Sequence, residues 1–342
     1  MTTVGDIPKR RAPRADVARY AGVSPAVVSY TVNAGPKPVA DATRARVLEA
    51  IRVLGYRPNA AARTLKIGST KMLGLIVPDS SNPFFAQYGH AIEDAAAAQG
   101  YALLVVNTGG APESLAPSIR TMASRQVDGM LIAFQPSMDA LAEISSAGIP
   151  TVLLNQTTAV SGLPAVGSDL YAGARSGVQH LIGHGHRSIA FVGDSDPLDE
   201  RQRGWRDALT AAGLHPGPIA ASDFTREGGY LAGRELLSEN RRASAVFVSS
   251  DMQASGVLRA FHEAGLSLPD DFAVVSLDGS PESEYSWPAL TTASQSVVDM
   301  AAEAVRHVIT PTEQTRFTLY PTTLVVRQSC GCAWPEAESG TG

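Results

Sequence analysis

Side chains suited to recognising a small ligand recur in short segments that follow apolar runs. These segments combine carboxylates, an amide, an arginine and aromatic rings; they are residues 79–85, Asn155, residues 194–201, Phe224, Asp251 and Asp278. Carboxylates accept hydrogen bonds from hydroxyl groups, an arginine donates a fixed fork, and an aromatic face stacks on the apolar face of a ring. The pattern predicts a site for a small polyhydroxylated or heterocyclic ligand.

Motifs for catalysis, phosphate binding or metal binding are missing from the sequence. It contains no Gly-x-Gly-x-x-Gly, Gly-x-x-x-x-Gly-Lys or Gly-x-Ser-x-Gly segment. His184 and His186 have no partner ligand at a metal-binding spacing, and Cys330 and Cys332 alone cannot supply the four ligands of a zinc site. We therefore expect no catalytic residue, no cofactor and no metal, and we interpret the two cysteines as incidental thiols in a reducing compartment.

Charge divides the chain into two unlike parts. Residues 1–70 hold 12 Lys and Arg against 4 Asp and Glu, whereas the other 272 residues hold 16 against 29. A cationic segment attached to an anionic body indicates a surface that meets phosphates. The alternative is a basic tail that only aids solubility.

The cationic part has the pattern of a helix-turn-helix. A helix that includes Asp16 in its first turn is followed by Gly22, and a second helix starts with Ser24 as N-cap and Pro25 at the first position. A third helix is predicted over residues 41–54, where an apolar stripe should close a three-helix core; the stripe consists of Val47, Leu48, Ile51 and Leu54. On the second helix, the outward residues that could read a major groove are Ala26, Ser29, Tyr30 and Asn33.

A short helix-prone segment, residues 59–66, follows the cationic helices. It is too short to hold a helix alone in water, so we expect order only when DNA or a second subunit packs against it. The alternative is an inert linker.

The remaining chain alternates apolar runs with helical segments. This alternation predicts an α/β body of two similar lobes with parallel sheets, and ligands of such sheets bind at the carboxyl ends of the strands. No run approaches about 20 apolar residues, and the N-terminus lacks a secretory signal, so we expect a cytoplasmic protein without a membrane span.

Several motifs resemble the LacI/GalR family of transcriptional regulators, whose members include the lactose repressor. They are Asp16-Val17-Ala18, Ala21-Gly22-Val23-Ser24, Leu54-Gly55-Tyr56-Arg57-Pro58-Asn59, Asn82-Pro83-Phe84-Phe85, Gly185-His186-Arg187 and Asp278-Gly279. The resemblance covers nearly the whole chain. It implies a helix-turn-helix head, a short hinge helix and a two-lobed periplasmic-binding-protein-like α/β body. It further implies a repressor that binds a pseudo-palindromic DNA operator as a homodimer, under the control of a small effector, most simply a sugar.

Residue roles follow from the resemblance by position. Contacts to DNA are implied for Ser24, Pro25, Ala26, Ser29, Tyr30, Asn33, Tyr56, Asn59, Arg63, Leu65 and Lys66, with Leu65 as the wedge in the minor groove. Contacts to the effector are implied for Phe84, Phe85, Asn155, Arg201, Phe224 and Asp278. Pro25, Ala26 and Tyr30 depart from the commoner family pattern, and Pro and Ala cannot donate to base edges, so the operator sequence stays open.

The resulting domain plan has a disordered basic arm, a DNA-binding head, a hinge, a ligand-binding body and a flexible tail. Their expected ranges are 1–12, 13–58, 59–70, 71–330 and 331–342, with one lobe over 71–163 and 293–330 and the other over 164–292. We expect the protein in a bacterial cytoplasm, on the nucleoid when bound to DNA. The alternative function is a sugar-handling enzyme or solute-binding protein with an N-terminal helical interaction module.

Overall fold

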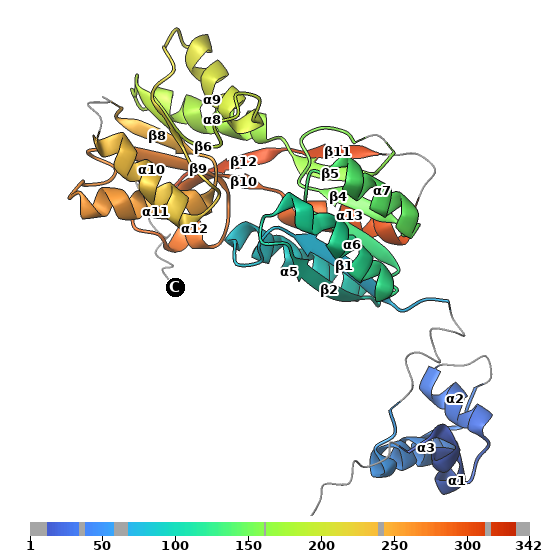
Figure 1. The fold of residues 1–342 in the computed structure, drawn as a ribbon. Helices are drawn as coiled ribbons and strands as arrows, with labels where there is room; N and C mark the ends of the chain where they lie inside the picture. The colour runs from blue at the N-terminus through green and yellow to red at the C-terminus, as the bar shows by residue number, and fades with distance from the viewer. Residues whose placement is uncertain are drawn as a thin grey trace, which may run out of the picture. The chain divides into compact units, whose positions relative to one another are not determined.

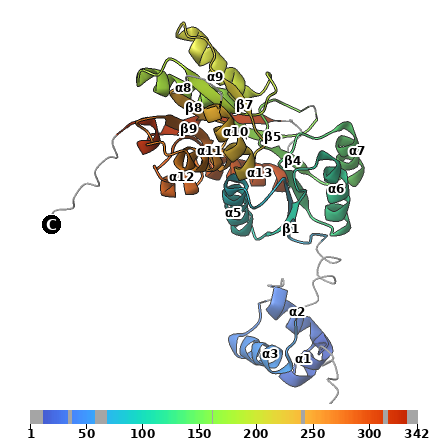
Figure 2. The same ribbon diagram turned by 60° about the vertical axis from the view of Figure 1, so that its left-hand side comes forward.

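The computed structural model describes residues 12–33, 38–57, 68–160, 162–238, 243–311 and 316–332. The chain divides into two compact units, residues 1–70 and 71–342, which we describe separately as the head and the body (Figures 1 and 2). Among the described helices, none has the length and apolar content needed to cross a membrane.

The head contains α1 (Arg14–Ala21), α2 (Pro25–Asn33) and α3 (Asp41–Leu54). Gly22 ends α1 with a left-handed φ of 64°, and the Ser24 hydroxyl accepts a bond from the Val27 N–H at the start of α2. The core is formed by Val17, Ala18, Ala21, Val28, Val47 and Ala50. The predicted helix-turn-helix is therefore present, and its helices end close to the predicted positions.

The prediction that Leu48 belongs to the core of the head is wrong. Its side chain is 51% exposed, whereas Val47 and Ala50 are fully buried. The face of α3 that meets α1 and α2 is centred on Val47, so Leu48 is rotated out of it. Ile51 and Leu54 are partly buried, as a stripe at helical spacing requires.

The first lobe of the body is built on a six-stranded sheet with the order β11-β5-β4-β3-β1-β2, counted over the described residues. The strands are β1 (Met72–Val77), β2 (Ala102–Asn107), β3 (Gly129–Ile132), β4 (Thr151–Leu154), β5 (Ala165–Ser168) and β11 (Phe317–Tyr320). The helices are α5 (Pro83–Ala98), η1 (Pro112–Ser114), α6 (Leu115–Ser124), α7 (Met138–Ala147) and α13 (Val297–Ile309). All neighbouring strands described in this sheet pair in parallel.

The second lobe repeats this plan, with the described strands in the order β12-β10-β9-β8-β6-β7. The strands are β6 (Ile189–Gly193), β7 (Ile219–Ala221), β8 (Ala245–Val248), β9 (Ala273–Asp278), β10 (Thr291–Gln295) and β12 (Thr322–Val325). The helices are α8 (Leu170–Gly183), α9 (Glu200–Ala211), α10 (Arg226–Ser238), α11 (Asp251–Glu263), α12 (Glu282–Tyr285) and η2 (Gln328–Cys330). The edge strand β12 runs antiparallel to β10, so this sheet is not wholly parallel.

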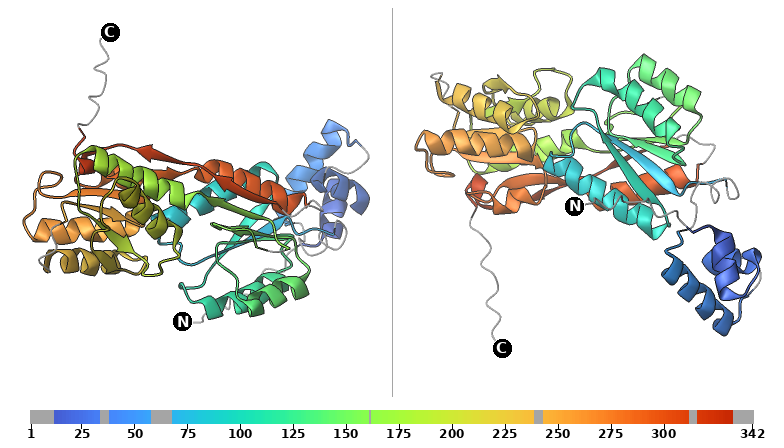
Figure 3. Two further views of the ribbon diagram at one scale, coloured as in Figure 1. Left: turned by 90° about the horizontal axis from the view of Figure 1, so that it is seen from above. Right: turned by 60° about the horizontal axis from the view of Figure 1, so that its bottom comes forward.

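The lobe boundaries differ from those expected from the sequence. Strand β5 pairs with β4 in the first lobe, although the expected boundary places it in the second, while β10 and β12 pair in the second lobe. Within the described residues the chain therefore crosses between lobes at Asp169, Ser296 and Pro321. Figure 3 shows the red C-terminal segment running along both lobes.

The crossing residues are hydrogen-bonded to one another. The Asp169 N–H donates to the Tyr320 carbonyl at 2.8 Å, and the Ser296 hydroxyl donates to the Pro321 carbonyl at 3.1 Å. The Thr322 hydroxyl approaches the Asp169 carbonyl at 3.5 Å. We call these residues the crossing cluster.

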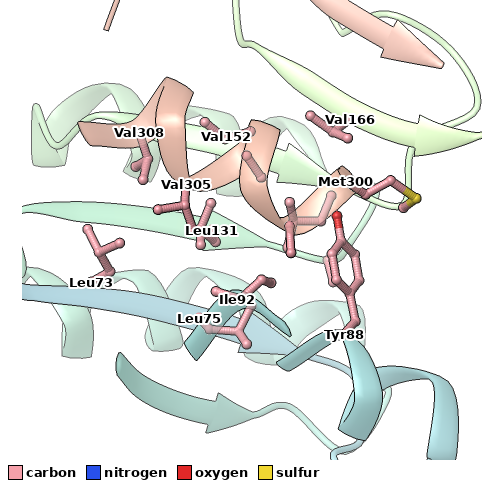
Figure 4. Close-up of a cluster of buried hydrophobic side chains, with 14 of the residues drawn as sticks. Leu73, Leu75, Tyr88, Ile92, Leu131, Val152, Val166, Met300, Val305 and Val308 are labelled. Atoms are coloured by element: carbon pink, nitrogen blue, oxygen red, sulfur yellow. The ribbon is translucent and has the colours of Figure 1, made fainter. Parts of the chain in front are cut away.

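Helix α13 completes the core of the first lobe although it comes from the far end of the chain. Met300, Val305 and Val308 pack against strands β1, β3 and β4 through Leu73, Leu131 and Val152, all of them buried (Figure 4). Burial of such apolar surface is the main favourable term in folding. It fixes the segment that follows β10 to the first lobe.

Candidate ligand-binding site

A cavity of about 770 Å³ lies where the loops of the two lobes meet. Its lining comes from segments that follow the carboxyl ends of the strands, among them β1, β4, β6, β7 and β9. This is the place where open α/β sheets bind ligands. The cavity brings together all six residues named from the sequence: Phe84, Phe85, Asn155, Arg201, Phe224 and Asp278.

Arg201 enters the cavity from the first turn of α9. Asp199 caps this helix, because its carboxylate accepts bonds from the backbone N–H groups of Arg201 and Gln202. The same carboxylate lies 3.3 Å from Arg201 Nη1, so Asp199 and Arg201 also form an ion pair. The Arg201 side chain is only 12% exposed, and its buried Nε has no hydrogen-bond partner among the described residues. A buried donor without a partner is a position that a ligand oxygen can satisfy.

Phe224 supplies an aromatic face beside this guanidinium. Its ring centroid lies 5.2 Å from the Arg201 Cζ, and the side chain is 38% exposed. An exposed ring next to a cation offers a stacking surface for an apolar ring face.

Phe84 and Phe85 enter from the opposite lobe at the start of α5. Asn82 caps this helix by accepting a bond from the Phe84 N–H at 3.0 Å. The two rings meet edge to face with centroids 5.1 Å apart. Phe84 is 3% exposed and belongs to the core of the first lobe, so it supports the cavity wall as a core ring, while Phe85 is half-buried.

Asn155 follows β4 in a left-handed conformation with φ of 55°. Asn tolerates this region better than most residues do. Its buried Oδ1 has no hydrogen-bond partner among the described residues. The cavity therefore presents an unsatisfied acceptor at Asn155 and an unsatisfied donor at Arg201.

Asp278 ends β9, lines the cavity and is 5% exposed. The Gln295 amide donates to its Oδ1 at 2.9 Å. Burial raises the pKa of the Asp278 carboxyl to about 8, the nearby Asp251 carboxylate contributes to this rise, and the Arg201 guanidinium opposes both effects. The carboxyl is thus held largely neutral at pH 7 before a ligand arrives.

Asp251 lies behind Asp278 and is held by hydrogen bonds. Its oxygens accept from the hydroxyls of Ser276, Ser280 and Thr292 and from the Ser280 N–H. Burial raises the pKa of the Asp251 carboxyl, while these donors favour its charged form. Asp251 organises the loop after β9, although it does not line the cavity.

The cavity also contains residues that sequence reasoning did not select. Phe134 follows β3, Gly109 and Gly110 follow β2, and Asp223 precedes Phe224. Phe134 closes an apolar run in the sequence, and a ring at the carboxyl end of a predicted strand is a usable signal for a cavity residue. Asp79, which belongs to the segment 79–85 named from the sequence, also lines the cavity, and hydrogen bonds from Ser81 lower the pKa of its carboxyl.

A second cluster of chemically reactive side chains lies in the second lobe, away from the cavity lining. His180 near the end of α8 and His184, the C-cap of this helix, meet Cys330 and Cys332 from the C-terminal segment, with all four ligand-type atoms within 4.8 Å of one another. The expectation of no metal depended on the spacing of these residues in the sequence, whereas the fold brings Cys332 next to His184. Cys332 also packs against the core of the second lobe, so the expected flexible tail does not begin at residue 331.

Comparison with known proteins now identifies the two units. Residues 15–59 match the bacterial regulatory proteins of the lacI family, and residues 178–330 match the periplasmic binding protein-like domain. The ribose operon repressor of Escherichia coli (strain K12) is 34% identical over 322 residues, which cover 90% of this chain and 96% of that protein. The chain belongs to the LacI family.

Solved structures of LacI-family proteins have the same fold. The lac repressor dimer bound to operator and an anti-inducer matches with a TM-score of 0.82 at 26% identity, covering 94% of this chain and 99% of that chain. A LacI family transcriptional regulator from Enterococcus faecium with bound ribose matches with a TM-score of 0.68 at 29% identity, covering 75% and 98%. The predicted fold, a helix-turn-helix head and a two-lobed periplasmic-binding-protein-like body, is confirmed.

The LacI-family segment spans α1, α2 and α3, which contain part of the residues that are expected to contact DNA. Ser24, Pro25 and Ala26 are exposed at the start of α2, while Ser29 and Tyr30 are half-buried. Tyr56 packs against the core of the head and is half-buried, so part of its ring stabilises the head. The side chain of Asn33 and the residues Asn59, Arg63, Leu65 and Lys66 lie outside the described part of the chain, as do residues 1–11 of the expected arm.

Proposed function

We propose that this LacI-family protein is a homodimeric repressor that binds an operator through α2 and responds to a sugar bound between the lobes of its body. The observation that carries the proposal is the cavity at the strand ends, in a chain that also holds a helix-turn-helix. The proposal includes no enzymatic step. The described residues that line the cavity include no histidine, cysteine or lysine, so a general base of these types is not available there.

Charge and exposure support the DNA-binding part of the proposal. The head segment holds 12 Lys and Arg against 4 Asp and Glu, and the first residues of α2 are exposed. Pro25 and Ala26 offer apolar contact surface, which suits thymine methyl groups and DNA shape better than hydrogen bonding to bases. The lac repressor, which matches this chain with a TM-score of 0.82, was solved as a dimer bound to its operator.

The cavity chemistry supports a sugar. Arg201 Nε and Asn155 Oδ1 are a donor and an acceptor without partners among the described residues, Asp278 adds a carboxyl group, and Phe224 offers a ring face. Ring hydroxyls and an apolar ring face complement this set. A LacI-family relative with the same fold has been solved with bound ribose, so pentoses are the first ligands to test.

Binding to DNA is tested with duplexes that the purified protein selects from a random pool. We expect Ala26→Glu to weaken binding by more than about tenfold, because a carboxylate on α2 faces DNA phosphates and juxtaposed like charges are costly. Affinity should also fall steeply with salt. Fluorescence anisotropy at several salt concentrations measures both effects.

Val53→Glu is the matched control, since it adds the same charge to an exposed position of α3. Equal losses in both variants would argue against α2 as the reading helix. Failure to select any duplex would overturn the proposed function.

Replacement of Arg201 by Met tests the ligand site. A charge-assisted hydrogen bond contributes about 1.5–3 kcal/mol, so its loss should weaken sugar binding by about 10- to 150-fold. The sugar is chosen from a panel of pentoses and hexoses by its thermal stabilisation of the protein, and its affinity is then measured by calorimetry. Arg203→Met on the same helix is the control, because Arg203 pairs with Glu200 and does not line the cavity. If the affinity for the sugar is unchanged in Arg201→Met, Arg201 serves only in the ion pair with Asp199.

A further inference from the structure

The cluster of His180, His184, Cys330 and Cys332 has the composition of a tetrahedral metal site. Two thiol and two imidazole groups form the ligand set Cys2His2, which is typical of structural zinc. The two histidines lie one turn apart at the end of α8, so they project from one face of the helix. The two cysteines flank Gly331, whose positive φ of 97° turns the chain between them.

The distances between ligand atoms suit one small ion. Cys330 Sγ and Cys332 Sγ lie 3.2 Å and 3.7 Å from His180 Nε2, and Cys332 Sγ lies 3.2 Å from His184 Nε2. Bonds of about 2.3 Å to sulfur and 2.0–2.1 Å to nitrogen place tetrahedral ligands at separations of this size. Small adjustments of these side chains would therefore complete the coordination.

The surroundings of Cys330 orient its sulfur. Thr291 donates its hydroxyl to Cys330 Sγ at 3.1 Å, and the same hydroxyl oxygen accepts from the Arg327 N–H at 2.8 Å. Hydrogen bonds from an outer shell are a regular feature of protein metal sites. Cys330 is buried, Cys332 and His180 are half-buried and His184 is exposed, so an ion can reach the ligands from the solvent side.

We propose that these four residues bind one Zn²⁺, which attaches the C-terminal segment to α8. The two parts are about 150 positions apart in the sequence. They lie next to each other because β12 joins the second sheet and η2 follows it directly. The ion would hold η2 and Cys332 against the helix that starts immediately after the crossing at Asp169, and so would stabilise the second lobe.

The test uses the full chain, incubated with zinc, desalted and analysed for metal by mass spectrometry. We expect about one zinc per chain, and we expect Cys332→Ser and His184→Asn to bind zinc more than about 100-fold more weakly, because outer-shell changes alone cost about 10- to 100-fold. Both replaced residues are at or near the surface, so the variants should fold. His186→Asn is the control: His186 lies two residues from His184 but bonds to Ser244 and is not in the cluster.

Two further measurements separate zinc binding from other roles of the cysteines. Co²⁺ should replace zinc and give visible bands of a tetrahedral site with sulfur-to-metal charge transfer, which Cys332→Ser removes. A chelator should lower the melting temperature of the wild type and leave that of Cys332→Ser unchanged. Absence of bound zinc, absence of the Co²⁺ spectrum, or a Cys330–Cys332 disulfide in protein purified under reducing conditions would overturn the proposal.

Discussion

Replacing Asp278 by Asn is expected to stabilise the folded protein at neutral and alkaline pH and to flatten its pH dependence between about pH 4 and pH 8. Burial and the Asp251 carboxylate raise the pKa of Asp278 to about 8 in the fold, against an ordinary value of 3.8. Between pH 3.8 and about pH 8 the Asp278 carboxyl is deprotonated in the unfolded chain but stays protonated in the folded protein. Stability therefore falls as pH rises through this window, and the full loss is present above pH 8.

The size of the effect follows from the pKa difference. Each pKa unit corresponds to about 1.36 kcal/mol, so the wild type loses about 6 kcal/mol of stability across the window. The amide introduced by Asp278→Asn carries no charge, and its oxygen can still accept the bond from Gln295. Urea unfolding at pH 5, 7 and 8.5 measures the difference, with Asp223→Asn as control because that carboxylate is exposed on the cavity rim. Parallel pH curves for Asp278→Asn and the wild type would contradict a neutral Asp278.

Replacing Asp251 by Ala is expected to have the opposite effect and to destabilise the second lobe strongly. The change leaves three hydroxyls and the Ser280 N–H without their acceptor in a buried position. A buried polar group without a partner costs about 1–3 kcal/mol, so we expect a loss of about 3–5 kcal/mol in the free energy of unfolding after partial relaxation. The carboxylate also lies in the first turn of α11, where it favours the helix dipole.

Urea unfolding at pH 7 measures this loss. Asp270→Ala is the matched control, because Asp270 is a carboxylate of the same lobe that lies nearer the surface. A loss below about 1 kcal/mol for Asp251→Ala would mean that water replaces the carboxylate as acceptor.

Local patterns predicted the elements of the head and most of the body. Ser24 and Pro25 mark the start of α2, and the apolar run 72–77 is strand β1. Signals of this kind depend on neighbouring residues only, so a single sequence contains them. The segments after the strands also contained all six predicted cavity residues, because strand ends and cavity coincide in this architecture.

Pairing between distant segments could not be predicted in this way. Residues 165–168 form an apolar strand that would be buried in the sheet of either lobe. Only the hydrogen bonds of this strand to β4 and β11 assign it to the first lobe. The contact of His184 with Cys332 joins residues that are 148 positions apart in the sequence. Leu48 shows the same limit on a smaller scale, because the rotation of α3 within the head decides which apolar residues are buried.

The crossing cluster has a consequence for how the two lobes of the body can move relative to each other. Asp169, Ser296 and Pro321 are bonded to one another or to direct neighbours, so a change of backbone angle at one crossing is shared by the others. We therefore expect any relative motion of the lobes to be a rotation about these crossings, with independent sliding opposed. In such a rotation Phe85 and Arg201, from opposite lobes, approach or separate together, so that one angle between the lobes describes the opening of the cavity.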